Sequence, residues 1–572
     1  MMRKAEVAFA LCVRRKITRR ALLLSSLLAA GMISIPAMAA DRDDSSLVWT
    51  DNGPVRGFVQ NGVHEFLGIP YAAPPVGSLR WMPPQPPTPW KKPLDVTAFA
   101  NICPQNFELG VYAGPPSTTE DCLYLNVFTT NIGRGADHNR REKVPVMLWI
   151  HGGGWFDGES HDYDASKLAE GGPSGPTVVV TINYRLGLLG FLAHAALEAE
   201  GHPFADYGLM DQQAALRWVK QNIAAFGGDP DNVTIGGQSA GAVSTAANVA
   251  SPTAAGLFHR AIMESGPSIA FAPLDLAETR GAGFAAAAGC GTDNSTAAAA
   301  CLRGLKVEDI LALQGPYLTG LTLDGTVLPT AADEAWTTGQ FNRVPIINGT
   351  VEDEGSFAAT LNEYLSGQPM TAAGYTGLVT GIYTGNTNIF NGPGGIAGVP
   401  PNYPAGTAAK VLVQYPLAAY AGPSLAETAV LTDTESCRAR HLNHLLSQWV
   451  PLYAYEFRDR NAPWYFPPLS FPHGAAHTID LQFFFPLWHG GPLGTPYPLT
   501  IQERKLSDEL VAAWTSFMHS GDPNFVGNHP WPRYEADSPA YLSESVPNLS
   551  TLSETDFSST HQCAFWDGIL VY

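Results

Sequence analysis

The pentapeptide Gly237-Gln238-Ser239-Ala240-Gly241 constrains the fold of this chain more than any other segment. Residues 232–235 before it predict a β-branched strand, and the small residues 242–247 after it predict a closely packed helix. A serine between these elements must lie on a tight strand-to-helix turn, where the two glycines leave room for the neighbouring backbone. The segment therefore predicts a nucleophile elbow with Ser239 as nucleophile. The alternative is a chance match in a chain with 57 glycines.

A second glycine-rich segment, His151-Gly152-Gly153-Gly154-Trp155, follows a continuous apolar run at residues 144–150. Backbone N–H groups in such a run can bind the oxyanion that forms when a nucleophile attacks a carbonyl carbon. One motif thus supplies an attacking hydroxyl and the other supplies donors for the charge that the attack creates. Together they favour acyl transfer, most simply ester hydrolysis, over a chance match.

Alternating apolar strands and helices predict an α/β fold with a large, mostly parallel central sheet and helices on both faces. Mostly apolar runs, as expected for strands covered on both faces, occur at residues 144–150, 177–182, 344–347 and 452–457. Helices are predicted at residues 211–219 and 501–519, and an antiparallel hairpin at residues 47–50 and 55–63. The Gly-, Pro- and Thr-rich region 360–430 is expected to form helices and loops over the site. Because no repeat or low-complexity linker is visible, residues 40–572 are predicted to be a single domain.

The first 39 residues are predicted to be an export signal peptide. Basic residues precede an apolar run at residues 21–36, and Ala37-Met38-Ala39 matches a small-x-small cleavage site. The adjacent Arg19 and Arg20 favour the twin-arginine route over the general export route. An uncleaved membrane anchor is disfavoured because the apolar run is short. No other run is long enough to span a bilayer, so the mature protein is expected to be soluble and to be periplasmic or secreted.

The formal net charge of −19 bears on the partners of the protein. Such an acidic chain is a poor partner for nucleic acids or for anionic membranes. We interpret the acidity as a source of solubility, with a weak preference for neutral or cationic substrates as the alternative. The two glycine motifs instead imply a small-molecule ester as the partner.

The chain has seven cysteines, of which Cys12 lies in the export signal. The other six allow many connectivities, and their spacing only suggests that neighbours in sequence pair. Disulfides suit an exported protein, because export leads to an oxidising compartment. The alternative of a metal site lacks the paired C-x-x-C or histidine spacing of zinc ligands.

The long motifs of the chain resemble those of the type-B carboxylesterases, the α/β-hydrolase family that includes cholinesterases and bacterial para-nitrobenzyl esterases. The resemblance covers nearly all of the chain after the signal, and it is carried by the serine motif with residues 226–230 before it, by residues 120–127, by residues 183–185 and by residues 66–75. It implies an α/β-hydrolase fold and a structural ion pair between Arg80 and Glu120. It also implies three disulfides: Cys103–Cys122, Cys290–Cys301 and Cys437–Cys563.

The resemblance also places two further members of a catalytic triad. The acid of the family lies in an Asp-Glu-Gly-Ser segment, here residues 353–356, which makes Glu354 the candidate. Its histidine follows a Gly-x-x pattern, here residues 474–476, which makes His477 the candidate. The order Ser–Glu–His is that of the α/β-hydrolases. Each assignment has an alternative. Glu352 and Asp353 adjoin Glu354, and these acidic residues would also suit a solvated loop. His473 lies four residues before His477 and would suit a protein surface.

These roles imply a mechanism. His477 would take the proton of Ser239 during attack and return it to the leaving alcohol, while Glu354 fixes the imidazole tautomer. Backbone N–H groups of Gly153, Gly154 and Ala240 would bind the oxyanion. Water would then release the acyl group, so the reaction requires no metal and no organic cofactor. The resemblance further implies that Ser265 hydrogen-bonds near Glu354, and the alternative is a plain loop serine.

The sequence departs from the cholinesterases at two places that help to hold a quaternary ammonium group. It has Gln238 where they have a glutamate before the nucleophile, and no tryptophan between Cys103 and Cys122. The suggested pocket is largely aromatic and apolar and favours neutral esters of small to medium size. Core packing is the alternative for each of its candidate residues: Trp155, Phe156, Gln238, Tyr317, Leu318, Leu321 and Trp488.

Two other functions compete with a carboxylesterase. A lipase or polyester hydrolase of the same fold would differ in its chain-length preference and in its activity on insoluble substrates. A catalytically inactive binding protein is disfavoured by the intact Ser239, Glu354, His477 and glycine run.

Overall fold

The structure of the protein is a computed structural model. It describes residues 46–106, 109–132, 142–266, 271–384, 403–486, 488, 490–491 and 494–570. The predicted export signal and its boundary with the domain lie outside these residues. The strands are β1 (Leu47–Thr50), β2 (Gly53–Arg56), β3 (Phe58–Gln60), β4 (Val63–Pro70), β5 (Leu94–Asp95), β6 (Tyr124–Thr129), β7 (Val144–Ile150), β8 (Val178–Ile182), β9 (Gly228–Gln238), β10 (Arg260–Glu264), β11 (Ile346–Val351), β12 (Leu452–Phe457), β13 (Ala540–Glu544) and β14 (Ser550–Ser553).

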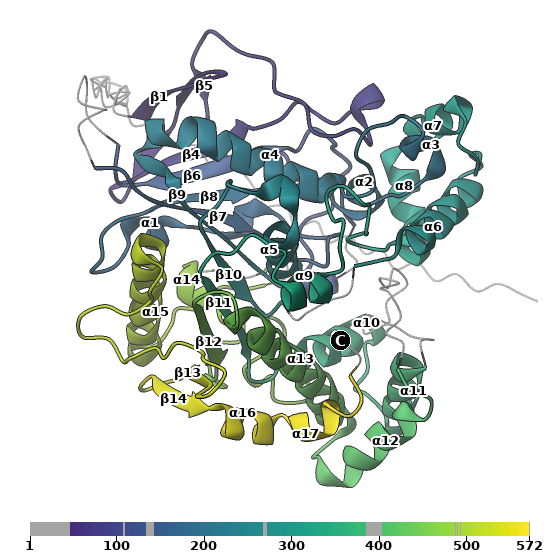
Figure 1. The fold of residues 1–572 in the computed structure, drawn as a ribbon, viewed down its shortest axis with the longest axis vertical. Coiled ribbons are helices and arrows are strands. Elements are labelled where there is room, and N and C mark those ends of the chain that lie inside the picture. Colours follow the sequence, from purple (N-terminus) through teal and green to yellow (C-terminus); the bar gives the residue numbers. More distant parts are fainter. Residues whose placement is uncertain are drawn as a thin grey trace, which may run out of the picture. The chain divides into compact units, whose positions relative to one another are not determined.

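One large sheet of 11 strands has the order β14-β13-β12-β11-β10-β9-β7-β8-β6-β4-β3 (Figure 1). All pairings from β8 through β7, β9, β10, β11 and β12 to β13 are parallel. The pairings beyond β8 and beyond β13 are antiparallel. The carboxyl ends of the parallel strands therefore meet at one edge of the sheet, where open α/β sheets bind their ligands.

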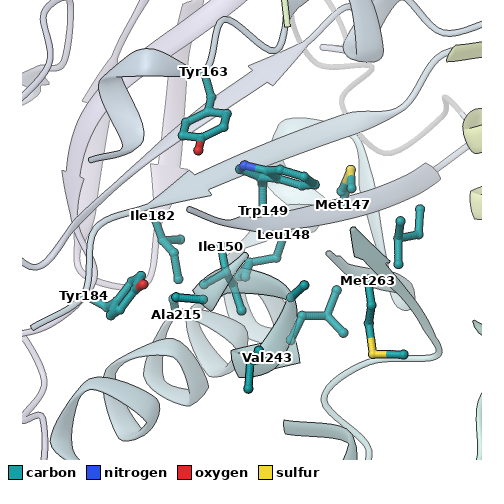
Figure 2. Close-up of a cluster of buried hydrophobic side chains, with 14 of the residues drawn as sticks. Met147, Leu148, Trp149, Ile150, Tyr163, Ile182, Tyr184, Ala215, Val243 and Met263 are labelled. Atoms are coloured by element: carbon teal, nitrogen blue, oxygen red, sulfur yellow. The ribbon is translucent and has the colours of Figure 1, made fainter. Parts of the chain in front are cut away.

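The side chains of β7 pack on both faces of this sheet (Figure 2). Trp149 points to one face and lies 4.9 Å from the ring of Phe485 and 6.1 Å from that of Trp514. Leu148 and Ile150 point to the other face, toward the helices (Figure 2). All seven residues of β7 are buried, which explains the continuous apolar run.

Helices cover both faces of the large sheet and form the crossover connections between its parallel strands. Helix α5 contacts β7, β9 and β10 on the face opposite Trp149 (Figure 2). Helix α15 contacts β7 and β9, and its Trp514 lies on the Trp149 face. The helices are α1 (Ser166–Glu170), α2 (Gly187–Gly190), α3 (Ala195–Glu198), α4 (Tyr207–Asn222), α5 (Ala240–Ala250), α6 (Leu274–Ala287), α7 (Thr296–Arg303), α8 (Val307–Leu313), α9 (Ala332–Thr338), α10 (Ser356–Ser366), α11 (Ala372–Tyr383), α12 (Thr407–Gln414), α13 (Pro423–Ser447), α14 (Leu481–Phe484), α15 (Ile501–Ser520), α16 (Glu554–Thr560) and α17 (Cys563–Trp566). The prediction of a mostly parallel sheet with helices on both faces is confirmed.

One local prediction differs from the structure, and another is met in part. The N-terminal hairpin is formed by β1 and β2, whereas the segment expected to complete it continues into β3, which pairs with β4 in the large sheet. The region 360–430 contains the expected helices, among them α11 and α12. They pack with α13 and α17 in a separate apolar cluster that includes Tyr375, Tyr415 and Trp566. These aromatic side chains are apolar enough to form a small core of their own.

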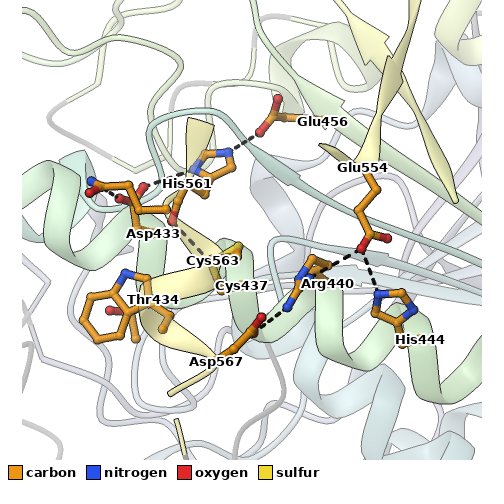
Figure 3. The surroundings of a disulfide bond; sticks show 12 residues. Asp433, Thr434, Cys437, Arg440, His444, Glu456, Glu554, His561, Cys563 and Asp567 are labelled. Atoms are coloured by element: carbon orange, nitrogen blue, oxygen red, sulfur yellow. Dashed lines mark hydrogen bonds and ion pairs between the residues drawn. A yellow bond between two sulfur atoms is a disulfide. The ribbon is translucent and has the colours of Figure 1, made fainter. Parts of the chain in front are cut away.

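Three disulfides confirm the expected pairing: Cys103–Cys122, Cys290–Cys301 and Cys437–Cys563. The third joins α13 to the amino end of α17 and lies beside His561 (Figure 3). The ring of His561 contacts Oε1 of Glu456 at 2.5 Å and Oδ1 of Asp433 at 3.2 Å. Burial disfavours its positive charge, but these two carboxylates raise the pKa of His561 to about 10. The C-terminal helices are thus held by a covalent bond and a buried charged network.

The expected ion pair between Arg80 and Glu120 is present and bidentate, at 2.7 and 2.6 Å. Arg80 also donates to the carbonyl oxygens of Arg303 and Leu305. This fork of donors ties the Cys103–Cys122 loop to the end of α7. Among the helices of the described ranges, none has both the length and the apolarity that crossing a bilayer requires.

Candidate active site

Ser239 lies between the end of β9 and the start of α5, as the elbow motif predicts. Its backbone has φ 58° and ψ −126°, a strained conformation for a residue with a side chain. A Cβ at Gly237 would come within 2.6 Å of the carbonyl oxygen of Ile150, and one at Gly241 within 2.0 Å of the same atom. Both glycines are therefore required for the close approach of the elbow to β7. The turn leaves Ser239 partly exposed at the carboxyl edge of the sheet.

The glycine run follows β7 directly and lies beside the elbow. Gly153 has φ +100°, and a Cβ there would approach the carbonyl oxygen of Asp157 to 2.0 Å. A Cβ at Gly152 would lie 3.0 Å from the Cβ of Ser239, which shows how closely the two motifs pack. Within the described ranges, the backbone N–H groups of Gly153, Gly154 and Ala240 donate no hydrogen bond to the protein. These donors are free for an oxygen atom bound beside Ser239.

His477 and Glu354 form a buried pair, with 2.5 Å between Nδ1 of His477 and Oε2 of Glu354. The other carboxylate oxygen of Glu354 accepts a hydrogen bond from the backbone N–H of Val351 at 2.9 Å. Both oxygens of the carboxylate are therefore held in place. Because a carboxylate only accepts hydrogen bonds, Nδ1 carries the proton and Nε2 of the neutral ring is left as an acceptor. Burial by itself would lower the pKa of His477, but the charge of Glu354 and its hydrogen bond raise it.

The side-chain amide of Gln238 contacts this free nitrogen. Nε2 of Gln238 lies 3.1 Å from Nε2 of His477, and the Gln238 side chain is buried. The amide N–H therefore donates to the nitrogen that a neighbouring hydroxyl would use. This contact places the His477–Glu354 pair against Gln238, the residue that directly precedes Ser239.

Replacing Gln238 with glutamate is expected to shift the acidic limb of the pH profile of kcat/KM to higher pH. A carboxylate about 3 Å from Nε2 would stabilise the imidazolium and raise the pKa of His477, and a base must be unprotonated to act. At pH values on the acidic limb, kcat/KM should fall by about tenfold, whereas kcat/KM on the plateau at higher pH should change less. Measurement of kcat/KM on a neutral p-nitrophenyl ester from pH 5 to 9 tests this. Gln238→Met, which is uncharged, should leave the limb in place, and an equal shift in both variants would contradict the electrostatic argument.

Sequence reasoning missed the aromatic neighbours of His477. The ring of Phe357, in the first turn of α10, lies 5.1 Å from the ring of His477 in an edge-on arrangement. Tyr112 lies 4.3 Å from Phe357 and 4.5 Å from Phe466. These rings come from three separate segments, so periodicity could not have grouped them. The only available signal was the position of Phe357 three residues after Glu354.

Buried carboxyl groups surround the Glu354 side of the site. Glu264 and Glu544 are buried, and within the described ranges their side-chain oxygens have no hydrogen-bond partner. Burial and the charge of Asp480 raise the pKa of both groups well above the usual range. Burial and the charge of Glu354 raise the pKa of Asp480 to about 7. Raised pKa values favour the neutral forms of these groups, which leaves Glu354 as the carboxylate that contacts His477.

The side chains that the sequence suggested for the pocket are mostly buried and packed against other parts of the domain. Trp155 lies at the end of the glycine run, where its Nε1 donates to Oγ of Ser244 at 3.0 Å. Tyr317 packs near Phe284 of α6, with 6.2 Å between the rings. Trp488 packs at 5.0 Å against Tyr465. Phe156, Leu318 and Leu321 are buried. These contacts place Trp155 against α5, the helix that follows Ser239, and show packing partners for Tyr317 and Trp488.

The expected hydrogen bond from Ser265 to the Glu354 side is absent. Oγ of Ser265 is buried and has no partner among the described residues. Of the two alternatives for Ser265, the structure favours the plain loop serine, and the carboxylate oxygens of Glu354 contact Val351 and His477 instead. Ser265 instead contributes its backbone N–H, which donates to the carbonyl oxygen of Gly349 at 2.8 Å.

Comparison with known proteins places this geometry in a family. Residues 44–566 match the model of the carboxylesterase family. The para-nitrobenzyl esterase of Bacillus subtilis is 34% identical over 86% of this chain and 93% of its own length. The medium-chain fatty acyl-CoA hydrolase precursor of Anas platyrhynchos is 34% identical over 91% of this chain and 92% of its own length. A solved structure of PNB esterase matches with a TM-score of 0.72 and 30% identity, covering 91% of this chain and 99% of that one. The chain therefore belongs to the carboxylesterase family, has its α/β-hydrolase fold and is a carboxylic ester hydrolase.

Proposed function

We propose that the protein cleaves esters through an acyl-enzyme on Ser239, with His477 as general base and acid and Glu354 as its orienting carboxylate. The observation that carries the proposal is the 2.5 Å contact between Nδ1 of His477 and Oε2 of Glu354, beside the elbow. As Oγ of Ser239 bonds to the carbonyl carbon, its proton passes to Nε2 of His477, the nitrogen that Gln238 contacts in this structure. His477 then gives that proton to the leaving alcohol as the ester C–O bond breaks.

The free backbone N–H groups of Gly153, Gly154 and Ala240 are the proposed oxyanion hole. Each such donor contributes about 3–4 kcal/mol to transition-state stabilisation in comparable hydrolases. Water deprotonated by His477 then attacks the acyl carbon, and the bond to Ser239 breaks with return of the proton to its oxygen. This sequence of steps uses only side chains and backbone groups of the protein.

The proposed substrates are neutral carboxylic esters of small to medium size. Support comes from the ring of Phe357 beside His477, on which Tyr112 packs, and from the uncharged Gln238 next to the nucleophile. A pocket of this kind binds apolar groups without favouring a cation. Among the relatives, one is a para-nitrobenzyl esterase and another, from Homo sapiens, is a cocaine esterase that is 32% identical over 95% of this chain. A lipase or polyester hydrolase of the same fold is the alternative.

We also propose that the protein is exported to the periplasm or secreted after removal of residues 1–39. Support comes from the basic and apolar pattern of that segment and from the three disulfides of the domain. Disulfides form and persist in oxidising compartments, to which an export signal leads.

Hydrolysis of p-nitrophenyl esters from acetate to palmitate by the mature protein is expected to be fastest on the short chains. The proposed pocket, with packed aromatic rings beside His477, would accept a limited acyl length, so we expect kcat/KM to fall by about tenfold or more between butyrate and palmitate. Release of p-nitrophenolate, measured at equal enzyme concentration, gives the series.

The matched blank for this series is the Ser239→Ala variant. Faster turnover of palmitate than of butyrate would assign the protein to the lipase alternative. A rate on every ester that equals the rate of the blank would contradict the proposed acyl-enzyme altogether.

A further inference from the structure

Asp353, the residue before Glu354, is not the solvated loop charge that its sequence suggests. It follows β11, and its side chain is only 14% exposed. Its Oδ2 accepts a hydrogen bond from the backbone N–H of Ala475 at 2.8 Å. Its Oδ1 accepts one from Nη2 of Arg460 at 3.0 Å. The carboxylate therefore joins two segments that lie more than a hundred residues away in sequence.

The backbone of Asp353 contacts the same segment. Its N–H donates to the carbonyl oxygen of Ala475 at 3.0 Å, and Asp353 and Ala476 form an isolated parallel bridge. Gly474 has φ +65°, and a Cβ at this position would lie 2.2 Å from Oδ2 of Asp353. The carboxylate is thus packed directly against the backbone of residues 474–476, and this contact requires a glycine at position 474.

The contacted segment carries His477. Ala475 precedes this histidine by two residues, and the neighbour of Asp353, Glu354, contacts Nδ1 of the same histidine at 2.5 Å. Two adjacent acidic side chains therefore hold one short segment at two points. Asp353 fixes its backbone, and Glu354 fixes the ring that projects from it.

We propose that Asp353 is a positioning residue for His477, acting through the hydrogen bond that its carboxylate accepts from Ala475. This inference rests on the proposed function, in which His477 transfers the proton of Ser239. Without the carboxylate, the N–H of Ala475 loses its acceptor, and of the two hydrogen bonds between Asp353 and this segment only the backbone one remains. Small displacements of a catalytic group lower the rate of the chemical step more than they weaken substrate binding.

The test compares Asp353→Ala with Asp353→Asn on p-nitrophenyl butyrate. Removal of the acceptor in Asp353→Ala should lower kcat by about 10- to 100-fold and leave KM within about threefold. The amide oxygen of asparagine can still accept from Ala475, so Asp353→Asn should keep kcat within about threefold of the wild type. A purely structural role for the charge would affect both variants alike.

Two further variants serve as control and as a second approach to the same contact. Glu352→Ala removes the adjacent carboxylate, which pairs with Arg458 at 2.5 Å and makes no hydrogen bond to residues 474–477 among the described residues. It should therefore leave kcat unchanged within about twofold. Gly474→Ala introduces a methyl group against Oδ2 of Asp353 and should cause the same selective fall in kcat, even if Asp353→Ala fails to fold.

Wild-type kcat in Asp353→Ala, or equal losses in Asp353→Asn and Asp353→Ala, would overturn the positioning role. Unchanged kcat in a folded Gly474→Ala variant would overturn it as well. The Ser239→Ala variant distinguishes these results from a failure of the proposed function. If that variant keeps full activity, the acyl-enzyme proposal is wrong, whatever the Asp353 variants show.

Discussion

Replacing Ser239 with alanine is expected to lower kcat for p-nitrophenyl butyrate by about 10⁵-fold while the protein stays folded. The side chain lost is the nucleophile itself, and the remaining His477 and oxyanion donors can only assist a slow attack by water. Stability should change little, because Ser239 is partly exposed and its strained backbone gains nothing from the hydroxyl. The measurement is steady-state turnover together with a thermal unfolding curve.

Ser265→Ala provides the matched control for this result. Ser265 also has a positive φ, of 50°, and its hydroxyl has no partner among the described residues. Its removal should leave kcat within about threefold of the wild type, because no step of the proposed mechanism uses that hydroxyl. A fall of kcat in Ser265→Ala as large as that in Ser239→Ala would mean that Ser239 had been misidentified as the nucleophile.

Replacing Glu354 with glutamine is expected to lower kcat by about 10³- to 10⁴-fold. An amide can present its N–H₂ group to Nδ1 of His477, which then accepts and leaves the proton on Nε2, the wrong nitrogen for a base. The amide also cannot stabilise the imidazolium that forms during attack. The measurement is kcat with its pH dependence on p-nitrophenyl butyrate.

The pH profile gives this variant a signature of its own. In the wild type the charge of Glu354 raises the pKa of His477, so its loss should lower that pKa and move the acidic limb to lower pH. This direction is opposite to that expected for Gln238→Glu. Glu435 also raises the pKa of His477, but burial raises the pKa of Glu435 itself to about 7, so it is only partly charged near the limb. Glu435→Gln should therefore move the limb in the same direction by less, and without the large fall in kcat. An unmoved limb in Glu354→Gln would contradict the assigned role.

The sequence predicted the parts of the site that are formed locally. The turn around Ser239 needs glycines two residues away on either side, and the run after β7 needs glycines to approach Asp157, so both leave a pattern in consecutive residues. The strands around them were predicted because burial on both faces requires apolar residues throughout. The assignments of Glu354 and His477 needed the family resemblance, since an acid and a histidine have no local pattern of this kind.

Contacts between distant segments could not be predicted from the sequence alone. The amide of Gln238 contacts a ring 239 positions later, and the carboxylate of Asp353 contacts a backbone N–H 122 positions later. The ring of Tyr112 packs on Phe357 because the first disulfide loop folds over α10. The alternative that Asp353 is a solvated loop charge could not be judged from the sequence for the same reason, because only the fold brings Ala475 to its carboxylate.

The Cys437–Cys563 disulfide would also keep the two fragments of the enzyme joined after cleavage by a protease within the loop that it closes. It closes a loop with a sequence separation of 126 residues that contains His477, whereas Ser239 and Glu354 precede it. A cut inside this loop, for example beside the fully exposed Val526, would leave the two fragments covalently joined through α13 and α17. For that cut, His477 stays on the same fragment as Ser239, and the disulfide retains the other fragment, which carries α16 and α17. The nicked protein would therefore separate into two pieces only after reduction.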